Sequence, residues 1–357
     1  MKIIHVINSL SIGGAEKMLL DICQEMNKID GLLVDVVIIS SDFTGFYDEY
    51  IRHGINVFSL PFKNKFDLPA LYRLYNLIKD YNIIHSHLFP CNYYVSILSL
   101  FLNKSKLITT EHSSYNKRRR IFILRPLEKL IYSRYNIIIA ISDATKKNLI
   151  HWVGYEDKII VTPNGIDLKS YSSEDNSHNS MKKNNKTFML MMIGSFSEQK
   201  DQDTIVRSLK YLPENIKLAL VGDGKRINIV QSLALELQLQ HRIEFLGKRD
   251  DVPKLISNAD IVILSSHWEG FGLAALEGMA TGKPVIASDV PGLNELVKDA
   301  GLIFPASNDK ELASLINQLY TSDEFYISIS KKCLERAQNF SIDKLVLKYL
   351  DIYRGNL

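Results

Sequence analysis

The sequence predicts an α/β protein made of two doubly wound, Rossmann-like domains, each built on a parallel sheet. Short apolar runs alternate with helical patterns along the whole chain, as in folds where strands and helices follow one another. Many of these runs are continuous in Ile, Val and Leu, which is typical of strands buried on both faces of a parallel sheet. The chain has 357 residues, more than one hydrophobic core usually holds, so we expect two domains.

Each half of the chain supplies its own strands. In the first half we expect strands at Lys2–Ile7, Leu33–Ile39, Ile55–Ser59, Ile83–His87, Lys106–Thr110, Ile137–Ile141 and Ile159–Thr162. In the second half we expect them at Phe188–Ile193, Lys217–Val221, Ile243–Leu246, Ile261–Leu264, Pro284–Ala287 and Gly301–Phe304. Helical periodicity lies between the strands, for example at Ala15–Ile29, Leu68–Tyr81 and Lys225–Leu239.

A polar stretch separates the two halves. Residues 169–186 (KSYSSEDNSHNSMKKNNK) contain almost no large aliphatic side chains, which is the composition of an exposed linker. We therefore assign residues 1–168 to an N-terminal domain, 169–187 to a linker and 188–340 to a C-terminal domain. Residues 341–357 have apolar positions at helical spacing. They predict a terminal helix, and the sequence leaves open on which domain it packs.

The composition is that of a soluble globular protein, with 46% hydrophobic and 23% charged residues. The longest uncharged apolar run, Tyr93–Leu102, is too short to cross a bilayer. Residues 1–7 are expected to form an opening strand, and no secretory signal pattern follows them. The three cysteines lie far apart, without the spacing of a zinc or redox site. We expect a cytoplasmic protein with reduced, buried thiols.

Polar and small residues cluster directly after the predicted strands in both halves. They are Ser11–Gly14, His85–His87, Glu111–His112, Ser142, Gly194–Lys200, Gly222–Gly224, Gly247 and Ser265–Gly272. Ligands of open parallel sheets bind outside the carboxyl ends of the strands. We therefore expect the two domains to face each other across a cleft that holds the active site.

Two glycine loops begin helices after the first strand of each half. Gly13 and Gly14 allow close backbone approach to an anion at a helix amino terminus, or form only a tight turn. The loop lacks the G-x-G-x-x-G pattern of dinucleotide binding, which argues against an NAD enzyme. In the second loop, Lys200 can reach a diphosphate. Asp201 and Asp203 form a D-x-D pattern, which we interpret as helix capping rather than metal binding.

Glu269 and Glu277 flank a Gly-Phe-Gly turn. In one continuous helix they would lie about 12 Å apart along the axis, but Gly270 and Gly272 predict a loop before a helix that begins near Leu273. The amides of residues 271–273 would then cradle an anion. Glu277 can accept hydrogen bonds from a ribose diol, as an acidic residue does in dinucleotide folds. Glu269 can accept them from the hydroxyls of a second group.

The histidines allow more than one interpretation. His85 and His87 share one face of a strand and could chelate a metal, but no third ligand has a convincing spacing. We favour the interpretation that they line the cleft or cap the end of the strand, so no metal is expected. His112 is either a hydrogen-bonded structural residue or a member of the site.

Basic and apolar residues mix between Asn116 and Tyr135 (NKRRRIFILRPLEKLIYSRY). From Lys117 to Arg134, seven basic residues stand against the single acid Glu128, although the whole chain carries only +3. A core-packed helix with a solvated basic face is one explanation. We favour peripheral contact of residues 117–134 with an anionic membrane, where each basic residue contributes about 1 kcal/mol. No nucleic-acid partner is expected, because the chain is nearly neutral and has no binding motif.

In this order, the motifs resemble those of group 1 glycosyltransferases, glycosyltransferase family 4, which have the two-domain fold called GT-B. The resemblance spans nearly the whole chain. It rests on GGAE (Gly13–Glu16), HSH (His85–His87), TEH (Thr110–His112), AIS (Ala140–Ser142), PNGID (Pro163–Asp167), GSFSEQK (Gly194–Lys200), VGDG (Val221–Gly224), FLG (Phe245–Gly247), EGFGLAALE (Glu269–Glu277) and GKPVIASDVPG (Gly282–Gly292).

The resemblance implies the following roles for the donor, a UDP- or GDP-sugar. Glu269 would bind the hexose hydroxyls and Glu277 the ribose. Lys200 and Gly14 would approach the diphosphate, and His112 would lie beside the transferred sugar. The donor loop would comprise Gly270, Phe271, Gly272 and Leu273, and His87 and Arg118 would lie on the acceptor side. The family usually has an arginine where this chain has Ser195; Lys248 or Arg249 would have to supply the missing charge.

The activity implied is metal-independent transfer of a hexose, with retention of anomeric configuration. The expected acceptor is a surface polysaccharide or lipid-linked oligosaccharide, as in capsule, exopolysaccharide or lipopolysaccharide synthesis. The chemistry would be a front-face displacement in which the departing phosphate helps to deprotonate the incoming hydroxyl. Two alternatives are a sugar-nucleotide epimerase and a catalytically silent nucleotide-sugar-binding partner of a synthesis complex. The protein would be cytoplasmic, with peripheral contact at the inner face of the membrane.

Overall fold

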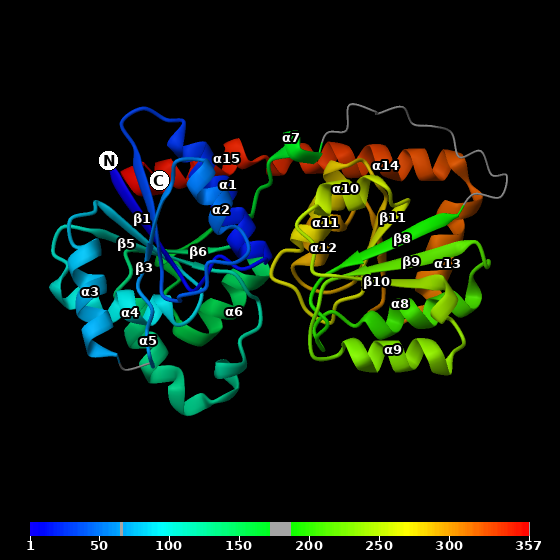
Figure 1. Ribbon diagram of the computed structural model, residues 1–357, viewed down its shortest axis with the longest axis horizontal. Coiled ribbons are helices and arrows are strands. Elements are labelled where there is room, and N and C mark those ends of the chain that lie inside the picture. Colours follow the sequence, from blue (N-terminus) through cyan, green and yellow to red (C-terminus); the bar gives the residue numbers. More distant parts are fainter. Residues whose placement is uncertain (65–66, 172–186, 357) are drawn as a thin grey trace. The chain divides into compact units, whose positions relative to one another are not determined.

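The computed structural model describes residues 1–64, 67–171 and 187–356. They form two compact units, one of Met1–Gly165 with Ile342–Leu357 and one of Ile166–Ser341. Figure 1 shows a sheet flanked by helices in each unit. Most of the predicted linker, residues 172–186, lies outside the described part of the chain.

The first unit contains a seven-stranded parallel sheet with the order β3-β2-β1-β4-β5-β6-β7. Its strands are β1 (Lys2–Ile7), β2 (Leu33–Ile38), β3 (Asn56–Ser59), β4 (Ile83–His87), β5 (Lys106–Glu111), β6 (Ile137–Ala140) and β7 (Ile159–Val161). The central strands are buried because helices cover both faces of a doubly wound sheet.

The second unit repeats this order in a six-stranded parallel sheet, β10-β9-β8-β11-β12-β13. Its strands are β8 (Phe188–Ile193), β9 (Ile216–Val221), β10 (Ile243–Gly247), β11 (Ile261–Leu264), β12 (Val285–Ser288) and β13 (Leu302–Phe304). The strand order reverses between β1 and β4 and between β8 and β11. Ligands of doubly wound folds bind at such switch points, beyond the carboxyl ends of the strands.

The α-helices of the first unit are α1 (Gly14–Asn27), α2 (Tyr47–Arg52), α3 (Leu68–Ile78), α4 (Cys91–Leu98), α5 (Arg125–Ser133), α6 (Asp143–Val153) and α15 (Ile342–Arg354). Those of the second unit are α7 (Leu168–Tyr171), α8 (Gln202–Ser208), α9 (Ile227–Glu236), α10 (Val252–Ser257), α11 (Leu273–Ala280), α12 (Leu293–Val297), α13 (Asp309–Thr321) and α14 (Asp323–Ala337). None of the helices in the described part of the chain has the length and apolar character that crossing a bilayer requires.

The fold class and every predicted strand are confirmed, with no end shifted by more than one residue. The helices differ more at their ends. The pattern at Lys225–Leu239 becomes the shorter α9, and the one at Leu68–Tyr81 ends at Ile78. Local capping explains some of these boundaries: Asp67 accepts a hydrogen bond from the backbone N–H of Ala70 (3.0 Å) where α3 begins.

The C-terminal helix α15 belongs to the first unit. Its Tyr353 hydroxyl lies 2.7 Å from Nδ1 of His85 on β4. Lys348 donates to the carbonyl of Val161 (2.7 Å), and Tyr349 is fully buried. The last helix of the chain therefore packs on the central strands of the first sheet.

Candidate functional site

The switch point of the second unit brings Lys200 and Glu269 together. Lys200 follows β8, and its Nζ donates to Oε1 of Glu269, which follows β11. Glu269 is only 6% exposed. It also accepts from Oγ of Ser266 (3.1 Å) and Nε2 of Gln199 (3.3 Å). Two predicted site residues, 69 positions apart in the sequence, thus form one buried ion pair at the place where doubly wound sheets bind ligands.

Glycines make room for this pair. A Cβ on Gly194 would lie 3.1 Å from Cε and 3.2 Å from Cδ of Lys200, so the lysine stem passes directly over this residue. A Cβ on Gly292 would lie 2.5 Å from the carbonyl oxygen of Glu269, and the φ of Gly292 is +90°. The loop after β12 therefore packs closely behind Glu269, in a backbone conformation that favours glycine.

The turn between Glu269 and Glu277 has the predicted form. Gly272 has a φ of +93°, and α11 begins at Leu273. Phe271 is 5% exposed and packs edge-on against Phe340 (5.5 Å between ring centroids), so its side chain serves packing. Gly270 adjoins Glu269 in the same turn, and its carbonyl oxygen lies against Gly292. The amides of the turn stand at a helix amino terminus, where anions are favoured.

Glu277 lies on α11 and accepts a hydrogen bond from the Tyr171 hydroxyl (3.0 Å). Tyr171 belongs to α7 of the same unit. It was not among the predicted site residues, because it stands at the edge of the polar stretch that was read as a linker. The contact fixes one oxygen of the carboxylate that we expect to bind ribose.

The D-x-D pattern has partners of its own. Asp201 is the N-cap residue of α8, and its carboxylate accepts from the Thr204 hydroxyl (2.6 Å). Burial raises the pKa of Asp201. Asp203 accepts from Nη2 of Arg226 (2.8 Å). Asp201 thus occupies the N-cap position without a side-chain hydrogen bond to a helix N–H, and Asp203 is held in an ion pair. The expected side-chain capping is therefore not seen.

This chain has Ser195 where the family has an arginine, and the structure places one further cation, Arg226, beside the same loop. Ser195 bonds only locally, with Ser197 (3.3 Å between Oγ atoms) and, through its carbonyl, with Gln202 (3.0 Å). Arg249 is bound in a bidentate pair with Asp251 (2.7 Å for each contact), whereas Lys248 is exposed. Arg226, the second residue after VGDG, was not predicted and is itself paired with Asp203. Its backbone N–H donates to the carbonyl of Phe196 (3.2 Å), so this cation adjoins the Ser195 loop.

The first unit has a histidine cluster at its own switch point. His5 on β1 is in register with His85 on β4. Nδ1 of His5 lies 2.9 Å from Nε2 of His87, and Nδ1 of His87 lies 3.1 Å from Nε2 of His112. His85 contacts the Thr110 hydroxyl through Nε2 (2.7 Å). Burial lowers the pKa of His5 to about 3 and that of His112 to about 4.

His5 was not predicted as a site residue, since its strand was read only as a buried opening strand. Within the described residues, His5, His85 and His87 are the one set of three potential metal ligands, with ligand atoms within 4.8 Å of one another. His5 and His87 already bond to each other, and both nitrogens of His85 have partners. A metal would have to replace these contacts, and a metal-free site stays a prediction.

In the glycine loop of the first unit, the side chain of Glu16 lies against Gly13. Gly14 is the first residue of α1, and Gly13 precedes it in an extended conformation. A Cβ on Gly13 would lie 2.5 Å from Oε2 of Glu16. Burial raises the pKa of Glu16. The approach of Gly14 to a diphosphate therefore stays a prediction, with Glu16 as a carboxylate beside the same helix start.

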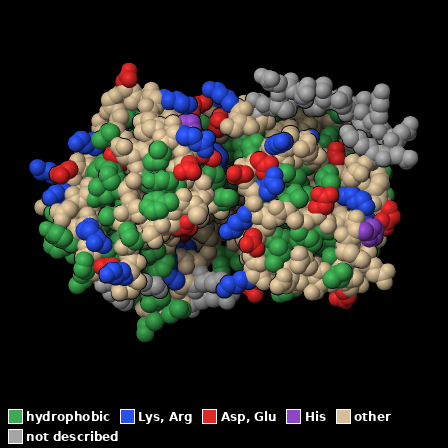
Figure 2. Space-filling model, viewed as in Figure 1, with side chains coloured by type: hydrophobic (Ala, Val, Ile, Leu, Met, Phe, Trp, Pro, Cys, Tyr) green, Lys and Arg blue, Asp and Glu red, His purple; other side chains and the backbone are tan. Residues whose placement is uncertain are grey.

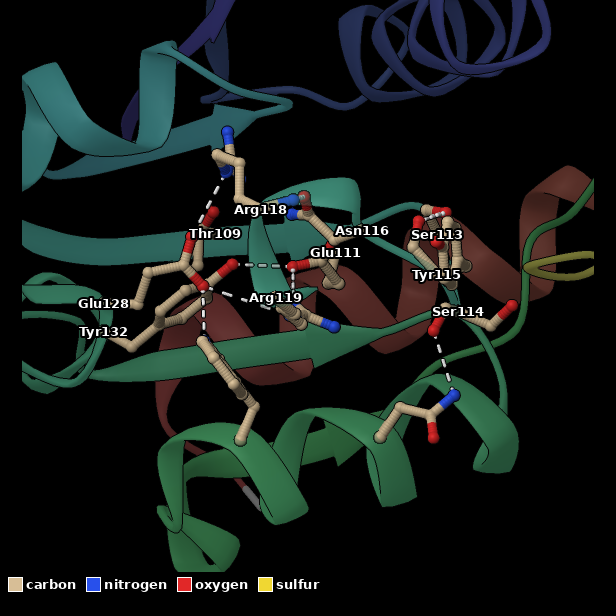
Figure 3. Close-up of polar contacts among 12 residues, drawn as sticks. Thr109, Glu111, Ser113, Ser114, Tyr115, Asn116, Arg118, Arg119, Glu128 and Tyr132 are labelled. Carbon is tan, nitrogen blue, oxygen red and sulfur yellow. Dashed lines mark hydrogen bonds and ion pairs between the residues drawn. The ribbon is translucent and has the colours of Figure 1, made fainter. Parts of the chain in front are cut away.

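Arg118 and Arg119 face inward rather than forming a free basic surface. Figure 3 shows them beside the carboxylates of Glu128 and Glu111. Nε of Arg118 lies 3.2 Å from Oε1 of Glu128, and its guanidinium stacks 3.8 Å over the Phe89 ring. Nη2 of Arg119 donates to Oε2 of Glu111 (2.8 Å). The side chains of Lys117 and Arg120 lie outside the described part of the structure.

Glu128 is the centre of this network and is fully buried. It accepts from the Tyr93 hydroxyl and from Nε1 of Trp152, both at 2.7 Å. Tyr132 donates to Glu111 (2.6 Å), the residue before His112. The basic segment is thus anchored to the domain through its charged residues.

Comparisons with known proteins agree with this architecture. Residues 12–170 match the model described as Glycosyltransferase Family 4, and residues 173–339 match the model for group 1 glycosyl transferases. The UDP-Gal:alpha-D-GlcNAc-diphosphoundecaprenol alpha-1,3-galactosyltransferase of Escherichia coli is 28% identical over 381 residues, covering 99% of this chain and 96% of the relative.

Solved structures show the same fold. HepE from Anabaena, in complex with UDP and glucose, superposes with a TM-score of 0.88 at 23% identity and covers 99% of this chain and 100% of its own. Sucrose-phosphate synthase from Thermosynechococcus elongatus has a TM-score of 0.82 at 21% identity, with 99% of each chain covered. Since consecutive family models span both units, this chain belongs to the group 1, family 4 glycosyltransferases and is an enzyme with the GT-B fold.

Proposed function

We propose that this glycosyltransferase moves a hexose from a UDP- or GDP-sugar to a lipid-linked oligosaccharide or a polysaccharide. The observation that carries the proposal is the ion pair of Lys200 with Glu269 at the switch point of the second sheet. The Escherichia coli relative uses UDP-galactose and a diphosphoundecaprenol acceptor, as its name states. HepE from Anabaena was crystallised with UDP and glucose. These names support the donor and acceptor classes proposed here.

In the proposed donor complex, Lys200 binds the diphosphate as a point charge. Glu269 then exchanges its contact with Lys200 for the hydroxyls of the hexose. The amides at the start of α11 contribute to phosphate binding, and Glu277 accepts hydrogen bonds from the ribose. The positive charge of Lys200 and the helix dipole stabilise the leaving nucleotide, so no metal is required.

The proposed reaction retains anomeric configuration through a front-face displacement. The bond between the anomeric carbon and the phosphate oxygen breaks, and the bond to the acceptor oxygen forms on the same face of the sugar. The departing phosphate oxygen takes the proton of the acceptor hydroxyl. The products are the nucleoside diphosphate and the extended glycan.

A thermal-shift panel of UDP, GDP and their sugars tests the donor, followed by transfer assays with the nucleotide sugar that stabilises the protein. We expect Lys200→Ala and Glu269→Ala to abolish transfer while the protein stays folded. Glu335→Ala is the matched control, since Glu335 forms only an exposed pair with Lys331 (3.9 Å). Near-normal turnover in either site variant would refute the assignment.

Slow release of nucleotide from the donor without acceptor separates a transferase from a catalytically silent binding partner. The silent partner gives thermal stabilisation without any such release. An epimerase would instead convert the sugar of the donor and leave the nucleotide attached.

We further propose that the first unit docks peripherally on an anionic membrane through residues 117–134. Five apolar side chains of this segment are exposed: Ile121 (51%), Phe122 (70%), Ile123 (83%), Leu127 (45%) and Leu130 (54%). Figure 2 shows hydrophobic side chains on the surface of this unit. Since Arg118 and Arg119 are paired inward, the apolar side chains supply the main attraction, and the exposed Lys129 and Arg134 supply the charge.

Flotation with anionic liposomes tests this contact. We expect the variant Phe122→Ser/Ile123→Ser to lose binding. Leu235→Ser is the control, because Leu235 is 61% exposed on α9 of the second unit. Absence of binding by the wild type, or equal binding by both variants, would remove the proposal.

A further inference from the structure

Three histidines of the first unit form a hydrogen-bonded chain. His112 contacts His87 through Nε2 (3.1 Å), and His87 contacts His5 through Nε2 (2.9 Å). The far nitrogen of the chain, Nε2 of His5, is buried and has no hydrogen-bond partner among the described residues. His5 and His87 are completely buried.

Each neutral imidazole carries one N–H and one acceptor nitrogen. The chain therefore has two possible directions. If His112 donated to His87 and His87 to His5, the free Nε2 of His5 would carry a proton with no acceptor. If His5 donates to His87 and His87 to His112, the free atom is an acceptor nitrogen without a proton. Buried N–H groups without a partner are rare in proteins, so the second direction is the favoured one.

This direction determines the tautomer of His112. Its Nε2 accepts from His87, so its proton must be on Nδ1. Nδ1 of His112 has no hydrogen-bond partner among the described residues, and His112 is only half-buried. The N–H at the end of the chain is therefore available to a ligand.

We propose that His5 and His87 are positioning residues that hold His112 as the neutral Nδ1–H tautomer. His112 thereby presents a hydrogen-bond donor, not a general base, to an oxygen of the sugar or the phosphate. This inference rests on the proposed function for the identity of that ligand. It agrees with a reaction in which the leaving phosphate takes the proton of the acceptor, because His112 in this tautomer has no free nitrogen to accept one.

His85 supports the chain without belonging to it. Its Nδ1 lies 2.7 Å from the Tyr353 hydroxyl and its Nε2 2.7 Å from the Thr110 hydroxyl. Its ring stacks on His87 with a centroid distance of 4.3 Å. Both nitrogens of His85 thus have other partners. His85 therefore does not determine the direction of the hydrogen bonds between His5, His87 and His112.

Long-range proton–nitrogen NMR spectra of the ¹⁵N-labelled full chain, recorded near neutral pH, test the proposal directly. We expect a protonated Nδ1 and an unprotonated Nε2 for His112, with the same pattern in His87 and His5. Single His→Asn variants assign the signals. A protonated Nε2 on His112 would overturn the proposal, and so would a zinc-dependent shift of the signals of His5 and His87 in protein freed of chelator.

Variants of His5 provide the kinetic test. His5→Phe removes the donor, so we expect a mixture of tautomers at His112 and about a tenfold lower kcat, with unchanged UDP affinity. His5→Asn can place an amide N–H near the position of Nδ1 and should restore the wild-type tautomers of His87 and His112 and most of the rate. The exposed His53→Phe is the control. Wild-type tautomer and kcat in folded His5→Phe would refute the positioning role.

The two proposals fail separately in this design. If no sugar nucleotide is a donor, the proposed function fails while the tautomer can still be read from the spectrum. If transfer occurs but His112 carries its proton on Nε2, only the positioning role is wrong.

Discussion

Lys200 donates directly to the carboxylate of Glu269, so the two residues assigned to the diphosphate and the hexose are paired with each other before any donor binds. Their side chains are 17% and 9% exposed. A pair so little exposed is held by mutual charge neutralisation, and removing one partner leaves the other uncompensated. In the proposed donor complex, the donor would therefore replace a contact that also stabilises the fold.

A double-mutant cycle on this pair is expected to show strong coupling. Lys200→Met should lower the free energy of unfolding by about 3 kcal/mol, because it leaves a buried carboxylate without its cation. The double variant Lys200→Met/Glu269→Gln should recover more than about 1 kcal/mol of this loss. Urea denaturation of the four proteins measures both quantities. Additive losses would mean that the ion pair contributes nothing beyond its separate residues.

Gly292→Ala is expected to destabilise the second unit by displacing the backbone of Glu269. Its Cβ would lie 2.5 Å from the carbonyl oxygen of Glu269, and such overpacking costs about 1–3 kcal/mol. The left-handed backbone adds about 1 kcal/mol. Gly31→Ala isolates the second effect, since its φ is +79° and no atom lies within 4 Å of the added Cβ. Equal loss of unfolding free energy in both variants would contradict close packing behind Glu269.

The strands could be predicted from the sequence because each is a short, nearly continuous apolar run. The IVIL sequence of β11 is buried at all four positions. Lys200 and Glu269 were predicted as parts of one site because each follows a predicted strand, and ligands of open parallel sheets bind outside the carboxyl ends of the strands. Their direct pairing could not be predicted, since it depends on side-chain placement between loops 69 positions apart.

His5 and Glu128 show why other parts of the site could not be predicted. The contact of His5 with His87 depends on β1 lying beside β4, and a local pattern carries no information on strand order. On α5, three positions depart from the usual amphipathic pattern. Glu128 is fully buried, whereas Leu127 and Leu130 are exposed. The inward partners of Arg118 and Arg119 could not be predicted either, because Glu111 and Glu128 meet them only in the folded chain.

The histidine chain is expected to make the protein sensitive to acid. Burial lowers the pKa of His5 from 6.5 to about 3 and that of His112 to about 4. Between pH 6.5 and about 4 the unfolded chain binds protons that the folded chain excludes, so unfolding free energy falls as pH falls. Each such histidine contributes a slope of up to about 1.4 kcal/mol per pH unit.

Urea midpoints between pH 8 and pH 5 check this slope. His5→Asn should lower the slope of unfolding free energy against pH by the contribution of one histidine. The exposed His53→Asn should leave this slope unchanged. A stability that does not vary from pH 8 to pH 5 would mean that the buried imidazoles are protonated in the folded state.

Glu128→Gln is expected to loosen the segment that carries the proposed membrane contact. The carboxylate accepts from Tyr93 and Trp152 and lies opposite Arg118. An amide would direct an N–H toward one of these donors and leave the arginine uncompensated, so we expect a loss of about 3 kcal/mol of unfolding free energy. As the segment loosens and water gains access to Trp152, the fluorescence of this residue should shift to the red.

The exposed Glu335→Gln is the matched control, and its unfolding free energy should change by less than about 0.5 kcal/mol. Unchanged fluorescence and stability in Glu128→Gln would show that the network does not hold the segment. If the fluorescence shifts while liposome flotation is retained, the apolar residues of the segment bind membrane without needing the buried network beneath them. If the fluorescence shifts and liposome flotation is also lost, the buried network is needed to hold the segment in the form that binds the membrane.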